Sequence, residues 1–197
     1  MNLTNAALFL LAAVILLGSP GPAIAALLAV GRAVGFRQSM PFFWGLQAGL
    51  ALGAGVSAAG LASLLLAFPF AVTVMSGIAA LYLLWLAFKI GFAPLGGGAG
   101  GASASSAWSG FLLGATNPKA YLAFISLIAS HMIFQARPSL DAAVKWSWLV
   151  LIMIAVDLIW LYFGAVLGSV SLRPDTERAL NYAMGATIAL TALLPFF

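Results

Sequence analysis

The sequence contains no cysteine, and this absence excludes several kinds of chemistry. Disulfide bonds, thiolate zinc sites and thiol nucleophiles all require cysteine side chains. Histidine occurs once, as His131, and only four residues are acidic. Because metal sites need clustered oxygen, nitrogen or sulfur ligands, we expect neither a resident metal nor a metal ion as cargo, and we expect no cofactor.

Charge is scarce as well. Charged residues make up 6% of the chain and hydrophobic residues 64%, and the mean hydropathy is +1.14. A soluble domain usually carries about 25% charged residues, so the composition indicates a protein embedded in a lipid bilayer. The eight basic residues stand singly instead of forming a patch, so the net charge of +4 does not indicate nucleic-acid binding.

The apolar residues form six runs, each long enough to cross a bilayer as a helix. We therefore predict an all-α integral membrane protein with spans at residues 5–36, 40–67, 70–90, 107–135, 143–170 and 179–197. Ala23-Ile24-Ala25 resembles a signal-peptidase site, but a cleaved signal normally begins with basic residues, and none precedes the first run. We interpret that run as the first span.

Proline motifs interrupt two of these runs. Pro20-Gly21-Pro22 lies in the first span and Asn117-Pro118-Lys119 in the fourth, about half a chain apart. Because proline inside a helix lacks a backbone donor and clashes with the preceding turn, both spans are predicted to be broken. We predict two inverted three-helix repeats, residues 1–95 and 107–197, joined by a flexible Gly/Ser-rich linker at 96–106.

Basic residues in short loops predict the orientation, since such loops are retained on the cytoplasmic side. With both termini outside, five basic residues face the cytoplasm and two face outward, and the opposite orientation reverses these numbers. The inward residues are Arg32, Arg37, Lys89, Arg173 and Arg178, and the outward residues are Arg137 and Lys145. We therefore expect both termini to lie outside.

The two breaks also predict a site. Helix segments that restart after Pro22 and Pro118 present unpaired N–H groups and a positive dipole end within the membrane, which favours a bound anion. Lys119 adds a positive charge there, and Asp157 is the acidic residue placed deep in a predicted span. The predicted substrate-binding residues are Pro20, Gly21, Pro22, Asn117, Pro118, Lys119 and Asp157.

Two interpretations of this site stay open. In the functional one, the breaks and Lys119 hold a substrate carboxylate, while Asp157 meets the ammonium group of the substrate or carries a coupling proton. In the structural one, Lys119 and Asp157 form a permanent ion pair that holds the fourth and fifth spans together, because buried charges need partners whatever their role.

Other residues leave alternatives open too. Gly45, Gly49 and Gly53 recur every four residues, so they serve either packing within the bundle or a homodimer contact. Asn117 either coordinates substrate or caps the restarted helix. His131 lies near the end of the fourth span, where an interfacial position fits better than a proton relay.

Enzyme chemistry finds little support in the sequence. An intramembrane aspartyl protease needs two carboxylates in one site, and only Asp157 is available. A serine protease needs a base beside its serine, but His131, the sole histidine, lies at the edge of a span. We therefore expect no enzymatic activity.

Together these motifs resemble a known family along the whole chain. They are Pro20-Gly21-Pro22, residues 32–35, Gly45 with Gly49, Asn117-Pro118-Lys119-Ala120, Asp157-Leu158-Ile159-Trp160 and Arg178-Ala179-Leu180-Asn181. This set is similar to the LysE/RhtB family of amino-acid exporters. The resemblance implies an exporter in the bacterial inner membrane, driven by the proton motive force. In that membrane, the orientation predicted from the basic residues places both termini in the periplasm. Many members carry an acidic residue or histidine where this sequence has Leu50-Ala51-Leu52-Gly53.

We therefore expect a secondary transporter that exports amino acids or related small zwitterions by alternating access. The alternatives are an exporter of a different solute and a non-transporting membrane protein whose glycine stripes mediate assembly. The broken helices favour transport, because a scaffold has little reason to leave helix ends unpaired within the membrane.

Overall fold

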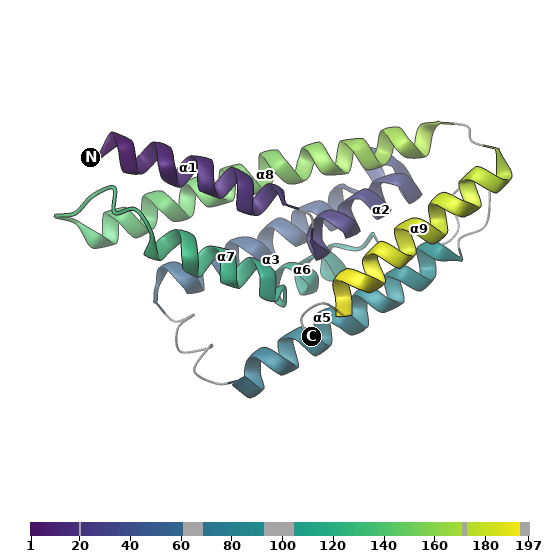
Figure 1. The fold of residues 1–197 in the computed structure, drawn as a ribbon, viewed down its shortest axis with the longest axis horizontal. Coiled ribbons are helices and arrows are strands. Elements are labelled where there is room, and N and C mark those ends of the chain that lie inside the picture. The colour runs from purple at the N-terminus through teal and green to yellow at the C-terminus, as the bar shows by residue number, and fades with distance from the viewer. Residues whose placement is uncertain (20, 61–68, 93–104, 171–172, 194–197) are drawn as a thin grey trace.

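The computed structural model describes residues 1–19, 21–60, 69–92, 105–170 and 173–193, and their regular structure is entirely α-helical. The helices are α1 (Leu3–Gly18), α2 (Pro22–Gln38), α3 (Met40–Ala58), α5 (Pro69–Gly91), α6 (Ala107–Ala115), α7 (Pro118–Ala129), α8 (Pro138–Ser169) and α9 (Pro174–Leu193). Figure 1 shows α8 running along the molecule beside α1 and α2. The all-α prediction is confirmed for these residues.

Three of the predicted spans are recognisable in the described helices. α8 is long and apolar enough to cross a membrane by itself, and α1 with α2 and α6 with α7 qualify as bent pairs. α3, α5 and α9 coincide with parts of the other predicted spans. Residues 61–68, 194–197 and most of the predicted linker lie outside the described part, and the six-span inverted arrangement stays a prediction.

Both proline motifs break a helix, as predicted. In each bent pair a proline occupies the first turn of the second segment, Pro22 in α2 and Pro118 in α7. A proline costs little there, because the N–H groups of a first turn have no partner within the helix. The segments bend by 58° between α1 and α2 and by 55° between α6 and α7. Pro22 is buried, so helix ends lie inside the molecule.

Glycines bring α3 and α6 into direct backbone contact. A Cβ added to Gly45 or Gly49 would overlap the backbone of α6, and a Cβ on Gly110 or Gly114 of α6 would overlap the backbone of α3. Only glycine permits so close an approach between helices. We call this contact the α3–α6 seam.

The glycine stripe of the second span therefore lies inside the chain. Gly45 and Gly49 belong to the α3–α6 seam, and a Cβ on Gly53 would lie 3.3 Å from the Tyr121 ring of α7. Packing within one chain accounts for all three glycines. The homodimer contact that this stripe would also allow stays a prediction.

A second seam joins α2 to α8. A Cβ on Gly31 of α2 would lie 2.5 Å from the carbonyl oxygen of Leu161, and one on Gly164 or Gly168 of α8 would overlap the backbone of α2. We call this contact the α2–α8 seam. Each seam joins one predicted half of the chain to the other, so the halves are packed together backbone to backbone.

α5 and α9 pair with each other beside the remaining helices (Figure 1). A Cβ on Gly185 of α9 would lie 2.9 Å from the carbonyl oxygen of Ala87 on α5. Arg32 of α2 ties this pair to the rest, because its Nη1 donates a hydrogen bond to Asn181 Oδ1 on α9.

The distribution of side chains is that of a protein surrounded by lipid. Large apolar side chains are exposed, including Phe70 at 80%, Leu81 at 71% and Leu190 at 66%. Gln47 and Asp157 are polar yet buried. This reverses the arrangement of a soluble protein, whose exposed apolar patches are small.

One basic residue counted for the predicted orientation is buried. The side chain of Lys145, counted among the outward residues, is only 1% exposed and forms an ion pair with Asp141 within α8. A buried lysine anchored in this way serves packing. Of the two basic residues predicted to face outward, Arg137 is the exposed one.

Candidate functional site

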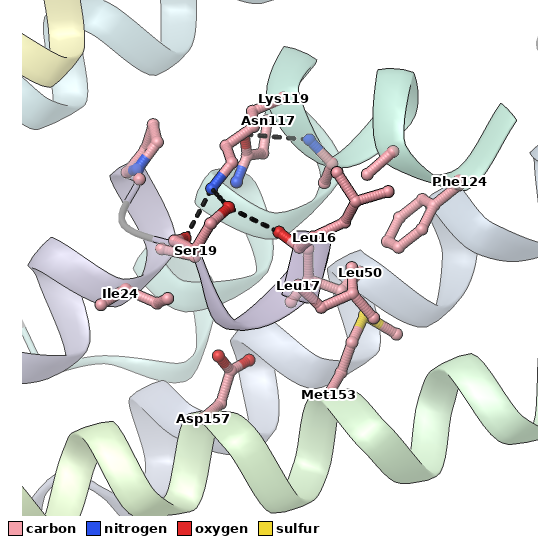
Figure 2. A pocket seen from close by; sticks show the side chains of 15 residues that line it. Leu16, Leu17, Ser19, Ile24, Leu50, Asn117, Lys119, Phe124, Met153 and Asp157 are labelled. Atoms are coloured by element: carbon pink, nitrogen blue, oxygen red, sulfur yellow. Dashed lines mark hydrogen bonds between the residues drawn. The ribbon is translucent and has the colours of Figure 1, made fainter. Parts of the chain in front are cut away.

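The two helix breaks contact each other through Lys119. Lys119 lies in the first turn of α7, and its Nζ donates hydrogen bonds to the backbone carbonyl oxygen of Ser19 at 2.6 Å and to Ser19 Oγ at 2.8 Å. Ser19 is the C-cap of α1. Figure 2 shows the lysine reaching from α7 to this helix end. The charged residue of the second break is thus bound to the first break.

Helix electrostatics explain this contact. The C-terminal end of α1 carries a partial negative charge and carbonyl groups that have no partner within the helix. A cation is disfavoured at the N-terminus of its own helix, and Lys119 occupies that position in α7. By crossing to Ser19, the ammonium group meets the opposite end of another helix dipole.

Gly21 provides the space that this lysine occupies. A Cβ on Gly21 would lie 2.8 Å from both Cδ and Nζ of Lys119. The backbone of Gly21 is extended, with φ of −177°, so its conformation does not require glycine. Gly21 is needed because any side chain there would push the ammonium group aside.

A cavity lies where the breaks meet (Figure 2). Its volume, taken as the space that the centre of a water molecule can reach, is about 40 Å³. Its polar lining comes from Ser19, Asn117, Lys119 and Asp157. The apolar lining includes Leu50, so α3 presents a hydrocarbon surface to the cavity.

Asp157 enters the cavity from the middle of α8. Its side chain is 4% exposed, and its Oδ2 accepts a hydrogen bond of 2.7 Å from Nε2 of Gln47 on α3. Gln47 is also 4% exposed. Figure 2 shows Asp157 pointing toward the break between α1 and α2 from the side opposite Lys119. The cavity therefore has a cationic group on one wall and a carboxyl group on the other.

The predicted site residues gather at this cavity. Gly21, Pro22, Asn117, Lys119 and Asp157 all line it. Pro118 starts α7 beside the cavity but is not among the lining residues. Pro20 lies outside the described residues.

The hydrogen bonds of the two charged residues bear on the predicted ion pair. Lys119 donates to Ser19, and Asp157 accepts from Gln47. Each charge thus has a polar contact on its own side of the cavity. The functional interpretation and the permanent Lys119–Asp157 pair both stay predictions.

The structure also places Asn117 and His131, the two other residues considered for a role in the site. Oδ1 of Asn117 lies 3.4 Å from the backbone nitrogen of Ala120, so Asn117 caps α7 while also lining the cavity. His131 is exposed in the turn after α7 and does not line the cavity. This position agrees with the interfacial role predicted for it.

Sequence reasoning missed two residues of the site, Ser19 and Gln47. Ser19 directly precedes the first proline motif, and a residue at a helix end has unpaired carbonyl groups nearby. Gln47 is a polar residue within the apolar run at 40–67. Polar residues inside membrane spans usually face the bundle interior, so this signal was available.

A comparison with known families gives a match along most of the chain. A family model described as LysE type translocator matches residues 14–194, a stretch that includes both helix breaks and Asp157. Neither a search of curated proteins nor a search of solved structures gave a match.

Proposed function

Because the chain belongs to the LysE type translocator family, it is a membrane transport protein, and we propose that it exports amino acids or related small zwitterions. The transport is secondary, operates by alternating access and is coupled to protons. The protein lies in the bacterial inner membrane with both termini in the periplasm.

The observation that supports a zwitterionic substrate is the pair of opposed charges in one cavity. Lys119 and Asp157 line the same space from α7 and α8. A substrate carboxylate takes over donors from the Lys119 ammonium group, and the substrate ammonium group binds the Asp157 carboxylate. Charge-assisted hydrogen bonds of this kind are roughly twice as strong as neutral ones.

The dimensions of the cavity favour a small substrate. The space of about 40 Å³ open to water centres corresponds to roughly three water molecules at 10–15 Å³ each. The Leu16, Ile24, Phe124 and Met153 side chains form an apolar wall beside the charges. An amino acid with a short apolar side chain meets both requirements.

Counterflow in proteoliposomes tests this function directly. Vesicles that contain the purified protein are loaded in turn with each common amino acid, and uptake of the labelled amino acid is measured with and without an imposed pH gradient. We expect saturable flux of a few small amino acids that responds to the gradient. The absence of flux for every amino acid, with folded protein, would exclude this substrate class and favour a different solute.

Lys119→Ala tests the role of the ammonium group. We expect apparent substrate affinity to fall by about 10- to 100-fold, since a hydrogen bond to a charged group contributes about 1.5–3 kcal/mol. Lys89→Ala is the matched control, because Lys89 lies on α5 against the Trp85 ring and does not line the cavity. A folded Lys119→Ala variant that transports at the wild-type rate would leave the lysine a structural role only.

A further inference from the structure

Gln47 of α3 is a buried hydrogen-bond partner of Asp157. It donates from Nε2 to Asp157 Oδ2 at 2.7 Å, but it is not itself among the residues that line the cavity. Both side chains are 4% exposed, so water does not replace this contact. Asp157 thus faces the cavity with its carboxyl group held from the α3 side.

The other end of the same amide is unusual. Oε1 of Gln47 is buried and accepts no hydrogen bond from any described residue. A buried acceptor without a partner is costly, and such atoms in native proteins often mark a functional requirement. Gln47 therefore keeps a hydrogen-bond acceptor beside Asp157 that the structure does not use.

The chemistry of the two side chains supplies a use for this acceptor. An ionised carboxylate only accepts hydrogen bonds, whereas a protonated carboxyl group also donates one. A glutamine amide carries two donors at one end and an acceptor at the other. Rotation of the amide by half a turn exchanges its ends, so Gln47 can bind Asp157 in either protonation state. Leucine or methionine could bind neither state, and a second carboxylate would repel the ionised one.

We propose that Gln47 is a positioning residue for Asp157, which holds the carboxyl group at the cavity wall in both its charged and its neutral form. The ionisable side chains among the described lining residues are Asp157 and Lys119, while α1, α2 and α3 present apolar groups and the Ser19 hydroxyl. Among the described residues, Gln47 is the side chain shown to hydrogen-bond Asp157. The consequence for transport rests on the proposed function, but the pairing itself does not.

Infrared difference spectroscopy tests the pairing without a substrate. The purified full chain in lipid vesicles is measured in acid and in alkaline buffer, and the C=O stretching band of protonated Asp157 is identified by its loss in Asp157→Asn. In Gln47→Met, which keeps the side-chain volume, we expect this band to move to higher wavenumber because the carboxyl group loses a hydrogen bond. An unchanged band would overturn the proposal.

Ser57→Ala is the matched control on the same helix, because it removes a buried hydroxyl group that bonds the Gly53 carbonyl oxygen. It should leave the Asp157 band in place. A shift of equal size in both variants would also overturn the proposal, since it would report a general effect of disturbing α3. Gln47→Glu provides a second test in case Gln47→Met does not fold. The two carboxyl groups would share a proton, so we expect the Asp157 band to change.

Transport assays then separate this inference from the proposed function. For an amino acid that the wild type transports, we expect Gln47→Met to lower kcat by roughly tenfold, the effect of one hydrogen bond to a charged group. A variant with a displaced band and wild-type transport would overturn the role in transport. A displaced band in a protein that moves no amino acid would establish the pairing and refute the proposed substrate.

Discussion

Lys145 and Asp141 form a buried ion pair one turn apart on α8, with Nζ and Oδ2 at 2.8 Å. The lysine also donates to the carbonyl oxygens of Ile128 and Ser130, and Oδ1 of the aspartate accepts from the backbone nitrogen of Ile133 at 2.7 Å. The pair therefore fastens the end of α7 and the following turn to α8. All three donors of the ammonium group are used.

Asp141→Asn should destabilise the protein by about 3 kcal/mol, because removing one partner leaves an uncompensated buried charge. The value lies at the lower end of the usual range, since two carbonyl groups still bind Lys145. Thermal unfolding in detergent measures the loss. Asp175→Asn is the control, because Asp175 is exposed at the start of α9. Equal stability of the two variants would contradict the structural role of the pair.

At the scale of single residues, the sequence predicts charges better than it predicts their partners. Lys119 and Asp157 could be identified because an ionisable group in an apolar run is costly and usually functional. Their contacts with Ser19 and Gln47 join residues about a hundred positions apart. Such contacts depend on how helices pack against one another, which no local pattern encodes. For the same reason Lys145 resembled a loop charge.

At the scale of helices, each broken span has one segment that packs closely against a neighbouring helix at a glycine seam. α2 and α6 pack backbone to backbone against α8 and α3. On the other side of the first break, an added Cβ on Gly18 of α1 would lie 3.9 Å from Val156, which is an ordinary contact. The helix breaks were predictable because proline acts locally. The partners of the glycine stripes were not, because a stripe does not specify which helix covers it.

Gly164→Ala should disrupt the α2–α8 seam. Its added methyl group meets the backbone of Leu28, which cannot move aside as a flexible side chain could. We expect destabilisation of about 1–3 kcal/mol, measured as a lower unfolding temperature. Gly77→Ala on α5 is the matched control, because no described residue outside its own helix turns lies within 4 Å of its added Cβ. That variant should be neutral or gain up to about 1 kcal/mol from helix propensity.

At the scale of the whole molecule, the family inferred from the motifs is confirmed by the match over residues 14–194. The membrane-embedded character was predictable from composition, since so few charges cannot cover a soluble surface. The predicted orientation depends on the count of basic residues in short loops and stays a prediction.

Variants with a single introduced cysteine test this orientation without background labelling, because the chain has no cysteine of its own. Gln38 at the end of α2 and Gln135 after α7 are both exposed, so Gln38→Cys and Gln135→Cys form a matched pair. With periplasmic termini, a membrane-impermeant maleimide added to intact cells should label Gln135→Cys and not Gln38→Cys. The reverse pattern would place the termini in the cytoplasm.

The contact between Lys119 and Ser19 has a consequence for how the exporter responds to its substrate. The ammonium group is already bound to the end of α1 through Ser19. Under the proposed function, a substrate carboxylate exchanges partners with a helix end, and its affinity is the difference between two interactions. This exchange lowers the net affinity for the substrate. The protein would then transport little substrate at ordinary cellular concentrations and would export it when its concentration rises well above them.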